Sequence, residues 1–178
     1  AAEGLLYRAF IEVVLILEDP EPFPDTWIYV HDPGVKLGRV QNYKKWSPAM
    51  VPDPGTTCLG LEYFCFEGDD LWSATDEALA ALGLEESARI GLVNPERVRE
   101  TLVVRMPKAY PVYDLEYLAK TDRIAEYLAG IGNLRVAGRN GQHRYFTQDE
   151  SVLAGAYAVR GLAGEGFDPW QVQTAEYC

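Results

Sequence analysis

The 178-residue chain lacks several features that would assign it to a common functional class. No apolar run approaches the roughly 20 residues of a membrane-spanning helix, since Phe10–Leu17 is short and contains Glu12. Histidine is scarce, and nothing in the sequence places His31 and His143 together. This scarcity argues against a metal site and a Ser-His-Asp arrangement. No residue is a convincing nucleophile, so the sequence leaves the catalytic residues unknown.

Cysteine and positive charge are also scarce. The three cysteines include no Cys-x-x-Cys pair, which argues against a disulfide framework and indicates reduced thiols in a cytoplasmic protein. The net charge of −11 disfavours nucleic acid and anionic membranes as partners. Against this acidic background, Arg139 and Arg144 stand out in one glycine-rich stretch, although arginines of this kind often just pair with neighbouring carboxylates.

The chain also lacks a Gly-x-Gly-x-x-Gly fingerprint after a strand, the signature of a dinucleotide-binding βαβ unit. The nearest approach, Gly130–Asn133, follows a helical pattern and is typical of a helix C-cap. A strand-like run, Tyr7–Glu18, begins almost at once. We therefore expect a piece of a longer protein.

What the sequence does contain is a β-rich first part. Runs of β-branched and aromatic residues predict strands at Tyr7–Glu18, Thr26–Val30, Lys36–Tyr43, Thr57–Gly68 and Arg99–Met106. The second and third of these should form a hairpin. The adjacent Val103 and Val104 indicate that the last strand is buried on both faces.

Two longer stretches have helical character. Trp72–Leu92 should start at a Ser73 or Thr75 cap and bend, or divide into two short helices, because glycines interrupt its apolar pattern. Asn94–Glu96 should add a helical turn, and Asp114–Ile131 should form an amphipathic helix.

Aromatic side chains concentrate on the predicted hairpin and just after it, at Trp27, Tyr29, Tyr43 and Trp46. One interpretation is a wall of a substrate cavity, since such cavities are lined by aromatic residues and a few polar groups. The other is ordinary packing on the face of a sheet. The sequence favours ordinary packing.

The most informative stretch is Leu134–Ala163, which predicts a strand, a glycine-rich loop and a helix. Gly138 and Gly141 bracket Arg139 and Asn140, and glycine permits close approach of the backbone to a ligand. The following helix should be capped by Asp149 or Ser151. A helix N-terminus beside an arginine suits an anion or a polarised carbonyl group.

These motifs resemble the C-terminal flavin-contacting segment of FAD-dependent oxidoreductases. The family contains the protoporphyrinogen-oxidase-like and amine-oxidase-like proteins and the UDP-galactopyranose mutases. The similarity is carried by Gly138–Gly141, His143–Tyr145, Gln148–Asp149 and Gly155–Ala156, and upstream by Pro107–Asp114, Asn42–Pro48 and Gly60–Asp70.

The resemblance implies an α+β fold, in which a largely antiparallel substrate-domain sheet is packed by helices. Residues 1–113 would form the sheet domain, with a helical insert at about 72–98. Residues 114–165 would form a helix–strand–helix segment that caps the flavin, followed by a tail at 166–178. FAD would be contacted by Gly138, Arg139, Asn140, Gly141, Gln148, Asp149, Glu150 and Ser151.

The same resemblance implies a small-molecule substrate, for which the candidates are Arg39, Tyr43, Arg105 and Tyr110. In the resembling family the dinucleotide-binding domain is N-terminal, so the main hypothesis is a C-terminal part of an FAD-dependent, amine-oxidoreductase-like enzyme. This part lacks that N-terminal domain and is expected to be inactive by itself. Two alternatives stay open: a mutase-like flavin-dependent isomerase and a non-enzymatic interaction module. A homo-oligomer is also expected, because the apolar faces of Tyr7–Leu17 and of the last helix would lack cover.

Overall fold

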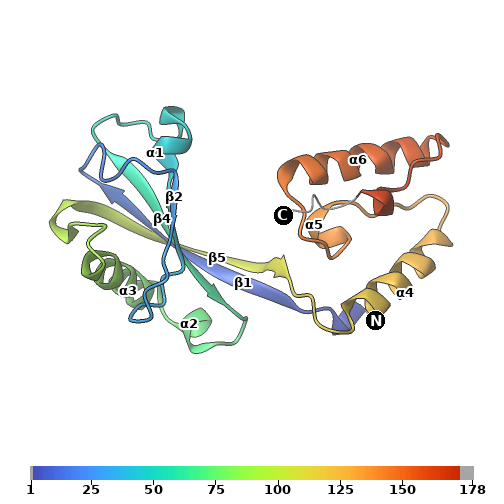
Figure 1. Ribbon diagram of the computed structural model, residues 1–178, viewed down its shortest axis with the longest axis horizontal. Helices are drawn as coiled ribbons and strands as arrows, with labels where there is room; N and C mark the ends of the chain where they lie inside the picture. The colour runs from blue at the N-terminus through green and yellow to red at the C-terminus, as the bar shows by residue number, and fades with distance from the viewer. Residues whose placement is uncertain (1, 173–178) are drawn as a thin grey trace. The chain divides into compact units, whose positions relative to one another are not determined.

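The structure is a computed structural model that describes residues 2–172 (Figure 1). Cys178 and the end of the predicted tail lie outside the described residues. The chain divides into two compact units, which we call the sheet unit, Ala9–Pro107, and the helical unit, Ala1–Arg8 with Lys108–Cys178. The expected boundary after Tyr113 thus differs from this division, because the end of the last strand groups with the helices.

The sheet has five strands in the order β2-β3-β4-β1-β5. Their bounds are β1 Tyr7–Leu17, β2 Trp27–Tyr29, β3 Arg39–Asn42, β4 Thr57–Cys65 and β5 Val98–Pro111. The pairs β1–β4, β3–β4 and β2–β3 are antiparallel, and the last is the predicted hairpin. The predicted α+β fold with a largely antiparallel sheet is confirmed.

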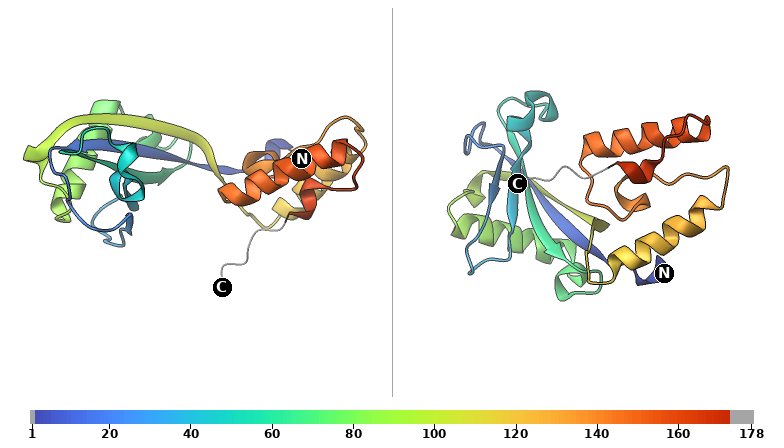
Figure 2. Two further views of the ribbon diagram at one scale, coloured as in Figure 1. Left: turned by 90° about the horizontal axis from the view of Figure 1, so that it is seen from above. Right: turned by 45° about the vertical axis from the view of Figure 1, so that its right-hand side comes forward.

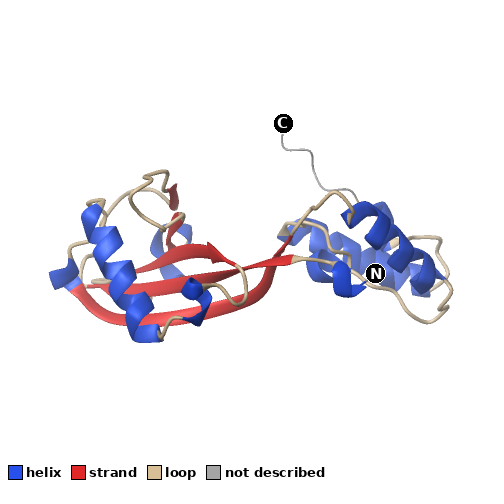
Figure 3. Ribbon diagram, turned by 90° about the horizontal axis from the view of Figure 1, so that it is seen from below, coloured by secondary structure: helices blue, strands red, loops and turns tan. Residues whose placement is uncertain are grey.

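One face of the sheet forms the main core. Alternate residues of β1, such as Ile11, Val13 and Leu15, are fully buried, as are Leu59 and Leu61 opposite them on β4. Helix α3, Asp76–Arg89, covers this face (Figure 3). A Cβ on Gly83 of α3 would lie 2.9 Å from the Val13 side chain, so glycine permits the close packing of helix and sheet.

The predicted burial of the last strand on both faces is wrong. β5 is an edge strand, with Val103 packed against the core and Leu102 and Val104 about half exposed on the other face. The strand also continues to Pro111, through a segment that contains two prolines. An edge position tolerates proline because one side of the strand needs no ladder hydrogen bonds.

The helical insert contains two helices, but they separate at Ala74 and Thr75 and not at the glycines that were expected to interrupt it, because Gly83 lies inside the continuous helix α3. α2 spans Asp70–Ser73, and Thr75 caps α3 by accepting a hydrogen bond from the Ala78 N–H at 3.2 Å. The predicted turn after Asn94 is the 3₁₀ helix η3, Pro95–Arg97. The sheet unit also holds α1, Tyr43–Trp46, and η2, Pro48–Met50.

The helical unit contains α4 Tyr117–Ala129, α5 Gly138–Gly141 and α6 Gln148–Leu162, together with the 3₁₀ helices η1 Ala2–Gly4 and η4 Pro169–Gln171. Figure 2 shows α5 and η4 packed beside α6. A second, smaller core of Phe146, Ala154 and Val172 joins them. No described helix combines the length and apolar character required to cross a membrane.

Two expectations for this unit are wrong. Leu134–Val136 is not a strand, because none of the described strands lies beside it to complete its backbone hydrogen bonds. Neither Asp149 nor Ser151 caps α6. The cap is Thr147, which forms a reciprocal capping box with Glu150 three residues later, a pairing that satisfies two N–H groups at once.

Candidate functional site

The glycine-rich stretch folds into the single helical turn α5, with Gly138 at its start. Gly138 has φ +81°, and no heavy atom lies within 4 Å of the place that a Cβ would occupy. The backbone here is therefore open to a flat or extended ligand, and a side chain would strain it. Asn140 and Gly141 complete the turn and are exposed. The Asn140 carbonyl accepts a hydrogen bond from the Tyr7 hydroxyl at 3.4 Å.

Arg139 is held firmly in the helical unit. Its Nε donates to the Ala109 carbonyl at 3.0 Å, and its Nη1 donates to the Phe146 carbonyl at 3.3 Å. The guanidinium carbon lies 4.6 Å from the ring centroid of Tyr110 and 4.2 Å from that of Tyr145. Aromatic faces attract a cation, so the two tyrosines fix the orientation of this charge.

The two tyrosines that contact Arg139 also contact each other. Tyr110 and Tyr145 stack with centroids 5.7 Å apart and an angle of 16° between their planes. The structure thus brings Tyr110, a substrate candidate, together with Arg139, a cofactor candidate. Tyr145 was absent from the predicted site residues, although the His143–Tyr145 motif that carries the family resemblance contains it.

Two residues with strained backbones lie around Tyr7 in the same unit. Lys108 has φ +52° and His143 has φ +50°, values that non-glycine residues rarely adopt. The Lys108 ammonium lies 5.9 Å from the Tyr7 ring centroid, and the His143 ring meets the Tyr7 ring edge-on at 4.7 Å. Strained residues of this kind cluster at functional sites, which makes both of them candidates.

His143 is buried and only partly satisfied. One ring nitrogen, Nε2, lies 3.2 Å from the Val112 carbonyl, whereas Nδ1 has no hydrogen-bond partner among the described residues. Neither Lys108 nor His143 was among the predicted site residues. Backbone strain leaves no pattern in a single sequence, so nothing but the family motif could have indicated them.

The start of α6 carries the other predicted cofactor residues. Glu150 is buried, and its carboxylate accepts hydrogen bonds from the N–H and hydroxyl groups of Thr147 at 2.7 and 2.8 Å. Ser151 donates to the Thr147 carbonyl at 2.8 Å, and Gln148 is exposed. The Thr147 hydroxyl and nearby backbone N–H groups hold the pKa of Asp149 below its usual value.

An FAD cofactor would meet two different environments in this unit. The turn at Gly138 and Arg139 fits it, because the backbone is open and the fixed charge is positive. The start of α6 fits less well, because the Asp149 carboxylate interacts with the same backbone N–H groups that a flavin carbonyl would need. Asp149 would have to turn away before the helix N-terminus could receive a ligand.

The remaining substrate candidates lie in the sheet unit and already have acidic or carbonyl partners. Arg39 pairs with Glu62 at 2.6 Å, and the Tyr43 hydroxyl donates to Glu12. Arg105 contacts Asp76 at 2.5 Å and donates to the carbonyls of Trp72 and Ala74. These arrangements favour a structural role for the two arginines over anchoring of an anionic substrate.

A cavity of about 370 Å³ lies elsewhere in the helical unit, beside α4. It is lined by Leu128, Arg135, Phe167 and Trp170, among others. None of the predicted cofactor residues lines it. Among residues 2–172, no cluster of three or more histidine, cysteine or acidic side chains could hold a metal ion.

Comparison with known proteins gives matches in structure alone. No protein-family model matches the sequence, and no curated protein does. The crystal structure of a reduced UDP-galactopyranose mutase is similar over 96% of this chain, with a TM-score of 0.77 and 19% identity. A protoporphyrinogen oxidase-like protein from Exiguobacterium sp. 255-15 is similar over 77%, with a TM-score of 0.59 and 20% identity.

At these identities the similarity establishes the fold. The chain has the fold of a part of both proteins, since it spans 37% of the mutase chain and 31% of the oxidase-like chain. Their names match two of the groups in the family that the sequence motifs resemble. The comparison therefore defines the fold, an α+β fold shared with a part of each of these two proteins.

Proposed function

We propose that this chain supplies the substrate-side sheet and the flavin-contacting segment of an FAD-dependent oxidoreductase. The observation that carries the proposal is Arg139. It is a cation fixed by two tyrosine rings and two carbonyl groups, next to an open glycine turn. A fixed positive site of this kind can bind an anion locally although the chain as a whole is acidic.

In this proposal the chain's own residues bind and orient. Nε and one N–H of Nη1 are engaged, so the guanidinium of Arg139 keeps further N–H groups for phosphate or for negative charge on the flavin. Gly138 and Gly141 let the backbone approach the cofactor closely. Tyr110 and Tyr145 keep the guanidinium in place through their ring contacts. FAD itself, when bound, supplies the redox chemistry by exchanging a hydride equivalent with the substrate.

Gln148–Ser151 belong to the same proposal. The backbone N–H groups at the start of α6 would face the flavin pyrimidine carbonyl, once the Asp149 side chain has moved aside. Asp149 therefore opposes binding of the cofactor. The carboxylate of Glu150 stays within the capping box and keeps the helix start in shape.

A flavin-dependent isomerase is the second candidate. It is favoured by the higher TM-score and the larger coverage of the match to UDP-galactopyranose mutase. The two functions differ in electron balance. An oxidoreductase leaves the flavin reduced after one anaerobic turnover, whereas an isomerase returns it to its starting state.

FAD titration tests the proposal in the protein encoded by the full reading frame. Arg139→Ala should weaken FAD binding by about tenfold or more, because a charge-assisted hydrogen bond contributes about 1.5–3 kcal/mol. Arg123→Ala, an exposed arginine on α4, is the matched control and should leave the affinity unchanged. Equal affinities for both variants would reduce Arg139 to a structural residue and contradict the proposal.

A further inference from the structure

Two acidic side chains face each other inside the sheet unit. Glu12 on β1 and Glu62 on β4 are direct partners in the antiparallel register, so their side chains lie on the same face of the sheet. Both are buried, with 6% and 3% of their surface exposed. Like charges directly opposite each other in a sheet destabilise it, and burial increases the cost of each charge.

The two carboxylates have unequal partners. The Glu62 carboxylate pairs with the Arg39 guanidinium at 2.6 Å and accepts a hydrogen bond from the side-chain amide of Gln41 at 3.0 Å, so its negative charge is compensated. Glu12 accepts a hydrogen bond from the Tyr43 hydroxyl, which is uncharged. An ionised Glu12 would therefore remain a buried negative charge beside a carboxylate that already uses the guanidinium of Arg39.

The missing side chain at Gly60 leaves room for the Glu12 carboxyl group in this position. A Cβ on Gly60 would lie 1.9 Å from Oε1 of Glu12, so the carboxyl group lies directly over the β4 backbone where a side chain is missing. The Tyr43 hydroxyl lies 3.0 Å from the same point. Glu12 is thus enclosed between a strand and a tyrosine and does not reach freely into water.

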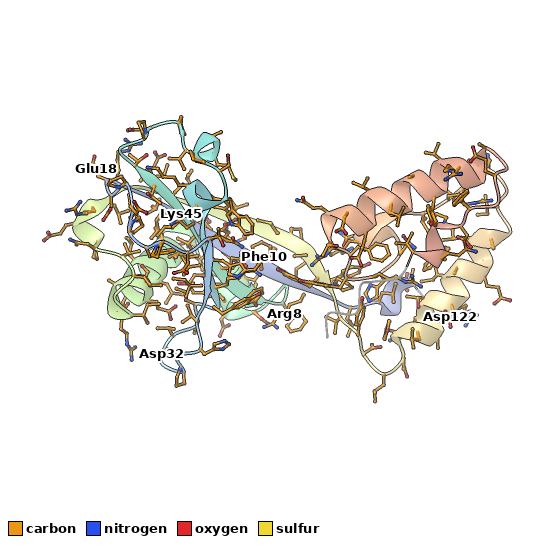
Figure 4. The ribbon with its side chains drawn as sticks, turned by 45° about the horizontal axis from the view of Figure 1, so that its top comes forward. Arg8, Phe10, Glu18, Asp32, Lys45 and Asp122 are labelled. Carbon is orange, nitrogen blue, oxygen red and sulfur yellow. The ribbon has the colours of Figure 1, made fainter. Side chains whose placement is uncertain are left out.

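Other charged groups around this face do not neutralise Glu12. On β4, the thiol of Cys58 has its pKa raised by burial and by Glu12. On α1, Lys44 donates to the carbonyls of Pro54 and Thr56. Lys45, labelled in Figure 4, pairs with Glu21.

Among the described residues of the sheet unit, the β5 residues on this face add no positive charge either. Val103 packs in the core, so alternation places Leu102 and Val104 on the open face, along with Glu100. Burial raises the pKa of Glu12 above its usual value, and Glu62 raises it further, while Tyr43 and Arg39 lower it. The geometry and the charge balance agree that the neutral form of Glu12 is favoured in the folded sheet.

We propose that the Glu12–Glu62 pair is a pH-sensitive device in the sheet, which holds one proton on Glu12 in the folded state and loosens the sheet when that proton is released. The folded state binds this proton more tightly than the unfolded chain does. Stability is therefore fully present below the usual pKa of a glutamate and falls as the pH rises through the raised pKa of Glu12. This device is independent of the proposed flavin function.

Urea unfolding at a series of pH values from about 5 to 9 tests the proposal. Within the titration window the unfolding constant of the native chain should rise, by up to about tenfold per pH unit. Glu12→Gln replaces the titrating carboxyl group with a neutral amide, so the unfolding constant should rise much less with pH in this variant. Glu85→Gln, an exposed glutamate on α3, should keep it. Hydrogen exchange of amides in β1 and β4 confines the measurement to the sheet unit.

Infrared spectroscopy of the native chain covers the case in which Glu12→Gln fails to fold. A carboxylic-acid C=O band should persist at pH values above the usual pKa of a glutamate and disappear as the pH is raised further. Loss of every such band at the usual pKa of a glutamate would overturn the proposal, and so would a pH dependence of unfolding that Glu12→Gln leaves unchanged.

Discussion

Replacing Gly60 by alanine should destabilise the sheet unit, although it adds a single methyl group. The new Cβ would lie 1.9 Å from Oε1 of Glu12, 2.9 Å from its Cδ and 3.0 Å from the Tyr43 hydroxyl. Contacts below 3 Å cannot persist, so Glu12 must move and lose the hydrogen bond from Tyr43. Overpacking and a lost buried hydrogen bond together predict a cost of about 2–4 kcal/mol.

Urea denaturation measures this cost as a fall in the midpoint with the slope unchanged. Gly132→Ala is the control, because no heavy atom lies within 4 Å of its Cβ position, and it should be close to neutral. Combining Gly60→Ala with Glu12→Ala removes the clash, so alanine at 60 should cost much less in that background. A loss below about 0.5 kcal/mol for Gly60→Ala alone would refute the packing argument.

Two further predictions concern the helical unit. Thr147→Ala breaks the capping box of α6 and should lower the free energy of unfolding in urea by about 1 kcal/mol. Asp122→Ala, at an exposed position on α4, is the control and should change it little. Equal effects of the two substitutions would contradict the capping role of Thr147. The chain should also self-associate, because Val152 and Val159 on α6 are 73% and 68% exposed. Light scattering across a dilution series checks this, and a strictly monomeric mass at every concentration would count against it.

The strands of the sheet unit could be predicted because their cause is local. Ile11, Val13 and Leu15 alternate with other residues in a β-branched run, and that pattern alone defines a strand with one buried face. The same run was also expected to lie exposed and to drive oligomerisation. The exposure is wrong, because α3 packs across the apolar face of this run, a contact between residues far apart in the sequence, whereas self-association stays a prediction.

The residues of Leu134–Val136 alone could not show whether this segment forms a strand. A β-type sequence becomes a strand only when a neighbour completes its hydrogen bonds, and the described strands provide none. The cap of α6 was predictable in principle, because Thr147 and Glu150 have the spacing of a capping box. Asp149 offered a competing cap two residues later, and the sequence alone did not decide between them.

The sequence predicted several residues of the candidate site but not how they contact one another. Arg139 and Tyr110 were both expected, but their contact depends on the way that the end of β5 meets α5 within the helical unit. Arg39 and Arg105 were expected near a substrate because the family resemblance implies one and a cation could anchor an anionic substrate. Their carboxylate partners, Glu62 and Asp76, lie far away in the sequence, so only the fold reveals those pairings.

The visible absorption spectrum of the purified protein encoded by the full reading frame tests the central claim most directly. The account predicts flavin bands at a stoichiometry of about one FAD per chain, and their weakening in Arg139→Ala but not in Arg123→Ala. The present chain by itself should be nearly colourless, because it lacks a Gly-x-Gly-x-x-Gly βαβ unit. A colourless protein from the full reading frame, even after incubation with excess FAD, would contradict the account.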